Sequence, residues 1–200
     1  ATRAGGFWGP PPAPGGTPSQ AQTLISDVLK TNNTLYKHAP NAATYHCPGD
    51  TRYKIAQLAS GWAYDSYSKS QNIGGESYNN YWGAGDTYTK FGNIRRPATT
   101  FAFVEDADWR NYTHGTWVVN WNGTPGNPSF IWVDPPAMYH GNVNTFAFTD
   151  GHAEFHKWIH NAIITAGKQA ALGVNAANFP GPTFGADYDY VRFNYQHPRW

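Results

Sequence analysis

The pair Asp150-Gly151 separates two strand-like segments, residues 143–149 and 152–158, and so restricts how this 200-residue chain folds. Asp-Gly readily adopts the positive φ angles of a two-residue turn, which predicts a β-hairpin. Three further strand-like segments, rich in aromatic and β-branched residues, precede it at residues 99–104, 116–121 and 129–133. Strands therefore dominate the middle of the chain, and we predict a central antiparallel β-sheet.

Helical periodicity is present on both sides of these strands. Ser19 and Gln22 have the spacing of a capping box, and apolar residues recur on one face of a predicted helix at about residues 19–31. A second apolar stripe runs from Ile159 to Ala170, and Gly173 is a typical helix stop. We expect the last 25 or so residues to be extended. The predicted fold class is α+β, with one N-terminal and one C-terminal helix.

The chain divides into an arm and one domain. Residues 1–18 are rich in glycine and proline and contain Phe7 and Trp8, while residues 19–200 have the size of a single globular domain. The arm is either a disordered leader or a segment whose two aromatic side chains dock on the domain or on a neighbouring subunit. Residues 45–92 are rich in Tyr, Ser, Asn and Gly, which predicts long aromatic loops.

Composition excludes several classes of partner. With 14 Lys+Arg against 13 Asp+Glu the net charge is +1, and no basic run is present, so we predict no nucleic-acid binding. No segment approaches the roughly 20 apolar residues of a membrane span. The 9 Trp, 13 Tyr and 11 Phe suit interfaces and sugar-stacking surfaces, which favours an extracellular or cell-surface location.

Four short motifs occur in an order that resembles a known family. His140 precedes Asp150-Gly151 by an H-X9-DG spacing, and Cys47-Pro48-Gly49-Asp50 is similar to a Cys-Pro-Ser-Asp box. Residues 64–68 resemble a Ser-Tyr-Ser segment, and residues 94–106 resemble a Pro-Ser-Glu-Thr strand that ends in acidic residues. Together these motifs resemble the prepilin-processing-associated, pseudopilin-like proteins of planctomycete and verrucomicrobial genomes.

The resemblance implies a type IV pilin-like head and assembly at the cell surface, and it implies no enzyme activity. The family's processing site and apolar N-terminal helix are absent from these 200 residues. We therefore expect either the head of a longer precursor or a secreted derivative. The expected function is that of a structural subunit of an extracellular filament, sheath or secretion-associated assembly, with copies of itself as partners.

The H-X9-DG residues are also the first candidate site. A histidine and a carboxylate brought together can orient one another or bind a metal, so His140, Asp150 and His152 are candidates. The alternative, which we favour, is that His140 hydrogen-bonds the Asp150-Gly151 turn and holds the register of the strands. Cys47, the only cysteine, is expected to be a buried small residue and not a thiolate nucleophile.

Two groups of acidic residues are candidates for calcium. Glu105, Asp106 and Asp108 come at the end of a predicted strand, and Asp187 and Asp189 are close together near the C-terminus. Carboxylate oxygens at short spacing suit calcium more than a transition metal, although solvated turn residues are the default. A glycosidase acid and base pair or a metal-dependent hydrolase remains a third alternative.

The aromatic residues carry the predicted binding function. We expect Trp117 and Trp132, which lie in strand-like segments, to be core residues. Tyr78, Tyr81 and Trp82 lie among turn-forming residues and are expected at an interface or a sugar-stacking surface. The resemblance favours subunit contacts, and the alternative function is a secreted protein that binds or acts on polysaccharide.

Overall fold

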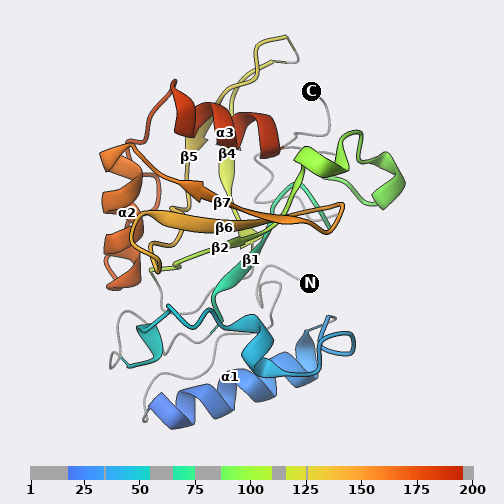
Figure 1. The fold of residues 1–200 in the computed structure, drawn as a ribbon, viewed down its shortest axis with the longest axis vertical. Coiled ribbons are helices and arrows are strands. Elements are labelled where there is room, and N and C mark those ends of the chain that lie inside the picture. The colour runs from blue at the N-terminus through green and yellow to red at the C-terminus, as the bar shows by residue number, and fades with distance from the viewer. Residues whose placement is uncertain are drawn as a thin grey trace.

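Figure 1 shows the computed structural model, which describes residues 18–33, 35–54, 65–74, 87–109, 116–124 and 126–195. The helices in these ranges are α1 (Pro18–Asn32), α2 (Asn161–Ala171) and α3 (Ala186–Tyr195). The strands are β1 (Tyr67–Ser70), β2 (Phe101–Glu105), β3 (Thr116–Trp117), β4 (Val119–Trp121), β5 (Phe130–Trp132), β6 (Val143–Phe148) and β7 (Ala153–Lys157). Short 3-10 helices are η1 (Ala42–Tyr45), η2 (Arg52–Lys54), η3 (Phe91–Asn93) and η4 (Pro97–Thr99).

The main sheet has the strand order β3-β1-β2-β6-β7, and β4 and β5 form a separate two-stranded sheet. This confirms the α+β class. The prediction of an antiparallel sheet is correct for β1, β2, β6 and β7, but β3 pairs parallel to β1, so the sheet is mixed. Parallel neighbours need a long connection, and here β2 and its flanking segments lie between β1 and β3 in the sequence.

The predicted hairpin is present, with a different turn. β6 and β7 pair in register from Val143 opposite Lys157 to Ala147 opposite Ala153. Gly151 has φ +99°, whereas Asp150 does not have a positive φ. The Phe148 N–H donates to the His152 carbonyl at 2.9 Å. The loop is therefore three residues long with glycine in its last position, as in hairpins that carry a glycine bulge, and not a two-residue turn.

The helix predictions were correct for α1 and α2 but missed α3. α2 ends at Ala171, and Gly173 follows with φ +75°, as expected of a glycine helix stop. The prediction that the C-terminal residues are extended was wrong for Ala186–Tyr195. Tyr188, Val191 and Tyr195 are buried at helical spacing, so aromatic content hid a periodic pattern.

Aromatic rings fill the core between the sheets and the two C-terminal helices. Trp117 and Trp132 are buried, which confirms their predicted core positions. Phe130 stacks on Tyr188 of α3 with ring centroids 4.4 Å apart. In Figure 1, α1 lies at the opposite end of the molecule from α3, with the main sheet between them. Among the described residues, no helix has the length and apolar character needed to cross a bilayer.

Candidate metal centre

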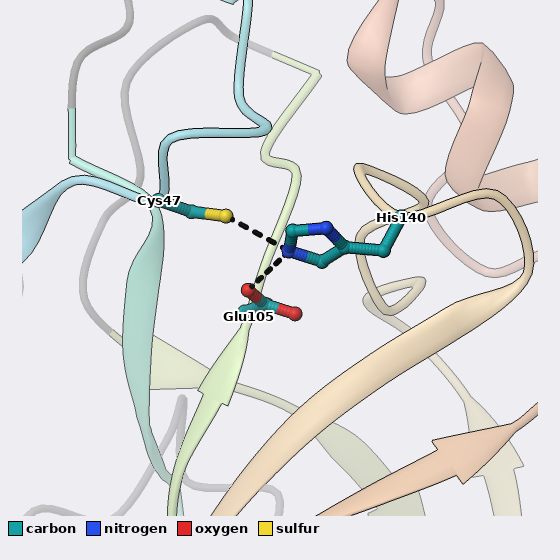
Figure 2. A group of neighbouring side chains, drawn as sticks. All are labelled: Cys47, Glu105 and His140. Atoms are coloured by element: carbon teal, nitrogen blue, oxygen red, sulfur yellow. Dashed lines mark hydrogen bonds and ion pairs between the residues drawn. The ribbon is translucent and has the colours of Figure 1, made fainter.

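Cys47, Glu105 and His140 point toward one another although they are far apart in the sequence (Figure 2). His140 Nε2 lies 3.1 Å from Cys47 Sγ and 3.2 Å from Glu105 Oε1. Cys47 follows η1, Glu105 is the last residue of β2, and His140 precedes β6. The Cys47 and Glu105 side chains are buried, whereas the His140 side chain is 44% exposed. One strand end and two loops therefore bring three different donor types to one partly open position.

His140 does not contact the Asp150-Gly151 turn, so the prediction that it braces the hairpin is wrong. The physical reason is the strand between them: β6 occupies Val143–Phe148. A strand rises about 3.3 Å per residue, so six residues span roughly 20 Å. The nine-residue spacing therefore places the histidine and the turn at opposite ends of β6. The Asp150 carboxylate instead accepts a hydrogen bond from His152 Nδ1 at 2.6 Å.

A tight turn positions Cys47. The Asp50 N–H donates to the Cys47 carbonyl at 2.9 Å, and the Cys47 N–H donates to Ser66 Oγ at 3.0 Å. Gly49 lies between them, and a Cβ at this position would be 2.9 Å from Cε1 of the His140 ring. The glycine therefore provides the space that the imidazole occupies, and Pro48 supplies the turn in which Cys47 sits. The Cys-Pro-Gly-Asp motif therefore forms a turn that holds the Cys47 thiol next to the His140 imidazole.

Asp50, the last residue of this turn, forms a buried ion pair with Arg52. Its carboxylate accepts hydrogen bonds from Nε and Nη2 of Arg52, the latter at 2.7 Å, and from Ser66 Oγ at 2.8 Å. Burial acts to raise the Asp50 pKa, but the charge and hydrogen bonds of Arg52 hold that pKa below its ordinary value. Asp50 is therefore ionised and serves as a structural anchor for the segment that carries Cys47.

Glu105 is oriented by the neighbouring strand. Its Oε2 accepts a hydrogen bond from the Thr145 N–H of β6 at 2.9 Å, while Oε1 faces His140. Its backbone carbonyl accepts from the Ala137 N–H at 3.0 Å and from Asn144 Nδ2 at 3.1 Å. Glu105 belonged to the acidic group at the predicted strand end, but its partnership with Cys47 and His140 was missed. Its position as the last residue of a strand was the available signal.

The surroundings of the Cys47 thiol favour its protonated form. Burial, followed by the hydrogen bond and negative charge of Glu105, raises the pKa of Cys47 to about 11. The thiolate is the nucleophilic form, so this setting does not activate Cys47 at neutral pH. Cys47 and Glu105 also contact the same imidazole nitrogen, whereas a nucleophile relay uses both ring nitrogens. The arrangement therefore differs from a cysteine–histidine–glutamate relay.

The four aspartates proposed for calcium do not converge. The Asp187 carboxylate accepts from the Ile159 and His160 N–H groups and from His156 Nε2, and Asp189 pairs with Arg192 at 3.0 Å. Ser68 Oγ donates to Asp106 at 2.9 Å. Asp108 is buried. In the described part of the chain, the group of three or more Cys, His, Asp or Glu donors close enough to share an ion is Cys47, Glu105 and His140.

The remaining predicted binding residues are aromatic side chains of the arm and of the loop after β1. Phe7 and Trp8 in the arm, and Tyr78, Tyr81 and Trp82 in the aromatic loop, lie outside the described residues. Their assignment to subunit contacts or to polysaccharide stays a prediction.

The sequence and the structure were compared with known proteins. No family model matches the sequence, and searches of curated proteins and of solved structures found no match.

Proposed function

We propose that this chain is a structural, pseudopilin-like subunit that associates with copies of itself at the cell surface or outside the cell. The four ordered motifs motivate the proposal. The observation that carries it is the exposed edge strand β7, which pairs with β6 on one side and ends the sheet on the other. Phe155, at the centre of β7, is 79% exposed. An edge strand with an exposed aromatic side chain is a template for pairing with another chain.

Other exposed apolar side chains lie C-terminal to β7. Ile159 follows the strand, Phe184 precedes α3 and Phe193 lies on α3, and each is more than half exposed. The net charge of +1 means that copies of the chain repel one another little over long distances. Burying one phenylalanine side chain contributes about 1.5–3 kcal/mol, so a contact through this strand is energetically substantial. The arm residues Phe7 and Trp8 are proposed as a second contact.

The test is sedimentation of the full chain over a wide concentration range. We expect reversible self-association that the Phe155→Asp substitution weakens by at least about tenfold, which corresponds to about 1.4 kcal/mol. Phe91→Asp is the matched control, because Phe91 is 65% exposed on η3 and is not part of the main sheet. A chain that stays monomeric throughout, or a Phe155 variant that associates like the Phe91 variant, would contradict the proposal.

A further inference from the structure

We propose that Cys47, Glu105 and His140 bind one divalent transition-metal ion, for which zinc fits best, through Sγ, Oε1 and Nε2. This inference is independent of the proposed self-association, because it rests on a different part of the molecule.

The distances between the donor atoms suit a single ion. The three ligand atoms lie within 4.8 Å of one another, and His140 Nε2 is 3.1 and 3.2 Å from the other two. Zinc lies about 2.0–2.3 Å from its sulfur, nitrogen and oxygen ligands, so tetrahedral neighbours are roughly 3.3–3.8 Å apart. Shifts of a few tenths of an ångström in the side chains would therefore complete the coordination.

The donor set selects the class of metal. Thiolate and imidazole ligands suit zinc and other transition metals, whereas calcium and magnesium prefer oxygen alone. Zinc takes this combination of Cys, His and carboxylate without a demanding geometry. The His140 side chain is 44% exposed, so the ion can enter from solvent and a water molecule can occupy the fourth position. The proposed centre therefore has three protein ligands and one exchangeable ligand.

The charge balance favours a cation at this position. The Glu105 side chain is 2% exposed, and the Cys47 sulfur would carry a negative charge once it binds the ion. Arg52, a buried cation on the same segment as Cys47, is engaged with the carboxylate of Asp50 at 2.7 Å. Buried charges in proteins are paired or coordinate metals, so an ion between Cys47 and Glu105 would compensate them. Binding transfers the thiol proton to solvent while the Zn–S bond forms.

The surrounding hydrogen bonds orient the ligands as an outer shell does in metal centres. The Thr145 N–H holds Oε2 of Glu105 at 2.9 Å and directs Oε1 toward His140. The Ser66 hydroxyl accepts the Cys47 N–H and donates to Asp50 at 2.8 Å, which fixes the turn that carries the thiol. Each buried ligand is thus held by the fold before an ion arrives.

The experiment is titration of the full chain, stripped with a chelator, with zinc chloride against a chromophoric competitor. We expect one ion per chain, and we expect His140→Ala and Cys47→Ser each to weaken binding at least about a hundredfold. His152→Ala is the matched control, because the His152 side chain is 42% exposed and hydrogen-bonded to a carboxylate, as His140 is, but lies at the far end of β6. It should bind like the unaltered chain.

Cobalt provides a second readout. Cobalt(II) bound at the centre should show a thiolate-to-metal charge-transfer band that Cys47→Ser abolishes, while circular dichroism confirms that each metal-free variant is folded. Binding well below one equivalent, equal affinities of the His140 and His152 variants, or a cobalt spectrum without the thiolate band would each overturn the proposal. Sedimentation in the presence of chelator keeps this outcome separate from that of the self-association test.

Discussion

Glu105 Oε1 lies 3.2 Å from His140 Nε2, and the other oxygen of the same carboxylate accepts a hydrogen bond from β6 at Thr145. One buried side chain therefore connects the loop before β6 to the paired strands β2 and β6. Cys47 adds the segment that follows η1, so three distant stretches of chain meet at this carboxylate. Substitutions here and in the adjoining ion pair test how much of the stability depends on these contacts.

Removing the Glu105 side chain should destabilise the fold strongly. In Glu105→Ala the Thr145 N–H loses its acceptor, and an unsatisfied buried donor costs about 1–3 kcal/mol in addition to the cavity. Glu105→Gln keeps an acceptor oxygen and should cost less. Urea unfolding in chelator measures both. Glu154→Ala, an exposed carboxylate on β7, is the control and should change stability by under about 1 kcal/mol. Equal losses for Glu105→Ala and Glu105→Gln would contradict this account.

The ion pair between Asp50 and Arg52 should be far more important than a surface pair. Both side chains are buried, and removing one partner of a buried pair typically costs about 3–5 kcal/mol. We therefore expect Arg52→Met to lower the unfolding free energy by that amount, as measured by urea denaturation. Lys30→Met removes the exposed pair with Asp27 and should cost at most about 1 kcal/mol. Similar effects of the two substitutions would show that Arg52 is not a structural anchor.

Asp65 should make stability fall as pH rises toward 8. The ordinary pKa of an aspartate is 3.8, and burial raises the pKa of Asp65 to about 8 although the positive charge of Arg52 acts to lower it. Between these values the folded chain keeps a proton that the unfolded chain releases, so the unfolding free energy decreases with pH by up to about 1.4 kcal/mol per unit. Asp65→Asn cannot ionise and should show a shallower decline between about pH 5 and pH 7.5 in urea unfolding. Parallel pH profiles for the two proteins would disprove the raised pKa.

Gly167 should resist substitution by a better helix former. In the middle of α2, alanine is intrinsically favoured over glycine by about 1 kcal/mol. A Cβ at residue 167 would collide with the backbone carbonyl of Pro136 and the side chain of Met138. We expect overpacking in Gly167→Ala to reduce the unfolding free energy by about 1–3 kcal/mol. The melting temperature should fall accordingly. Gly92→Ala, where a Cβ meets open space, is the control and should leave the melting temperature nearly unchanged.

Local signals were sufficient for the elements that local chemistry determines. Asp150-Gly151 between two strand-like runs identified the β6–β7 hairpin, and the apolar stripe ending before Gly173 identified α2. The same kind of signal was present in α3, where Tyr188, Val191 and Tyr195 are buried at helical spacing. It was missed because aromatic residues in this chain suggested loops and surfaces, whereas in α3 they pack into the core.

The centre could not be assembled from local signals. Cys47, Glu105 and His140 were each noted as a residue of chemical interest, but His140 was assigned to the turn that begins ten residues later, at Asp150. Sequence spacing through a strand measures distance along the chain, and β6 carries Asp150 away from His140. The contact with Glu105 depends on the pairing of β2 with β6, and the contact with Cys47 depends on where the loop after η1 packs.

Residue order alone thus accounted for the secondary structure whose causes lie within a few neighbouring residues: turn chemistry, helical periodicity and helix stops. Tertiary packing decided the parallel pairing of β3 with β1, the burial of the aromatic rings beneath α3, and the meeting of thiol, carboxylate and imidazole. The physical reason is that these contacts join residues separated by tens of positions. Their free energy comes from strand pairing and the exclusion of water, which no short segment of the chain contains.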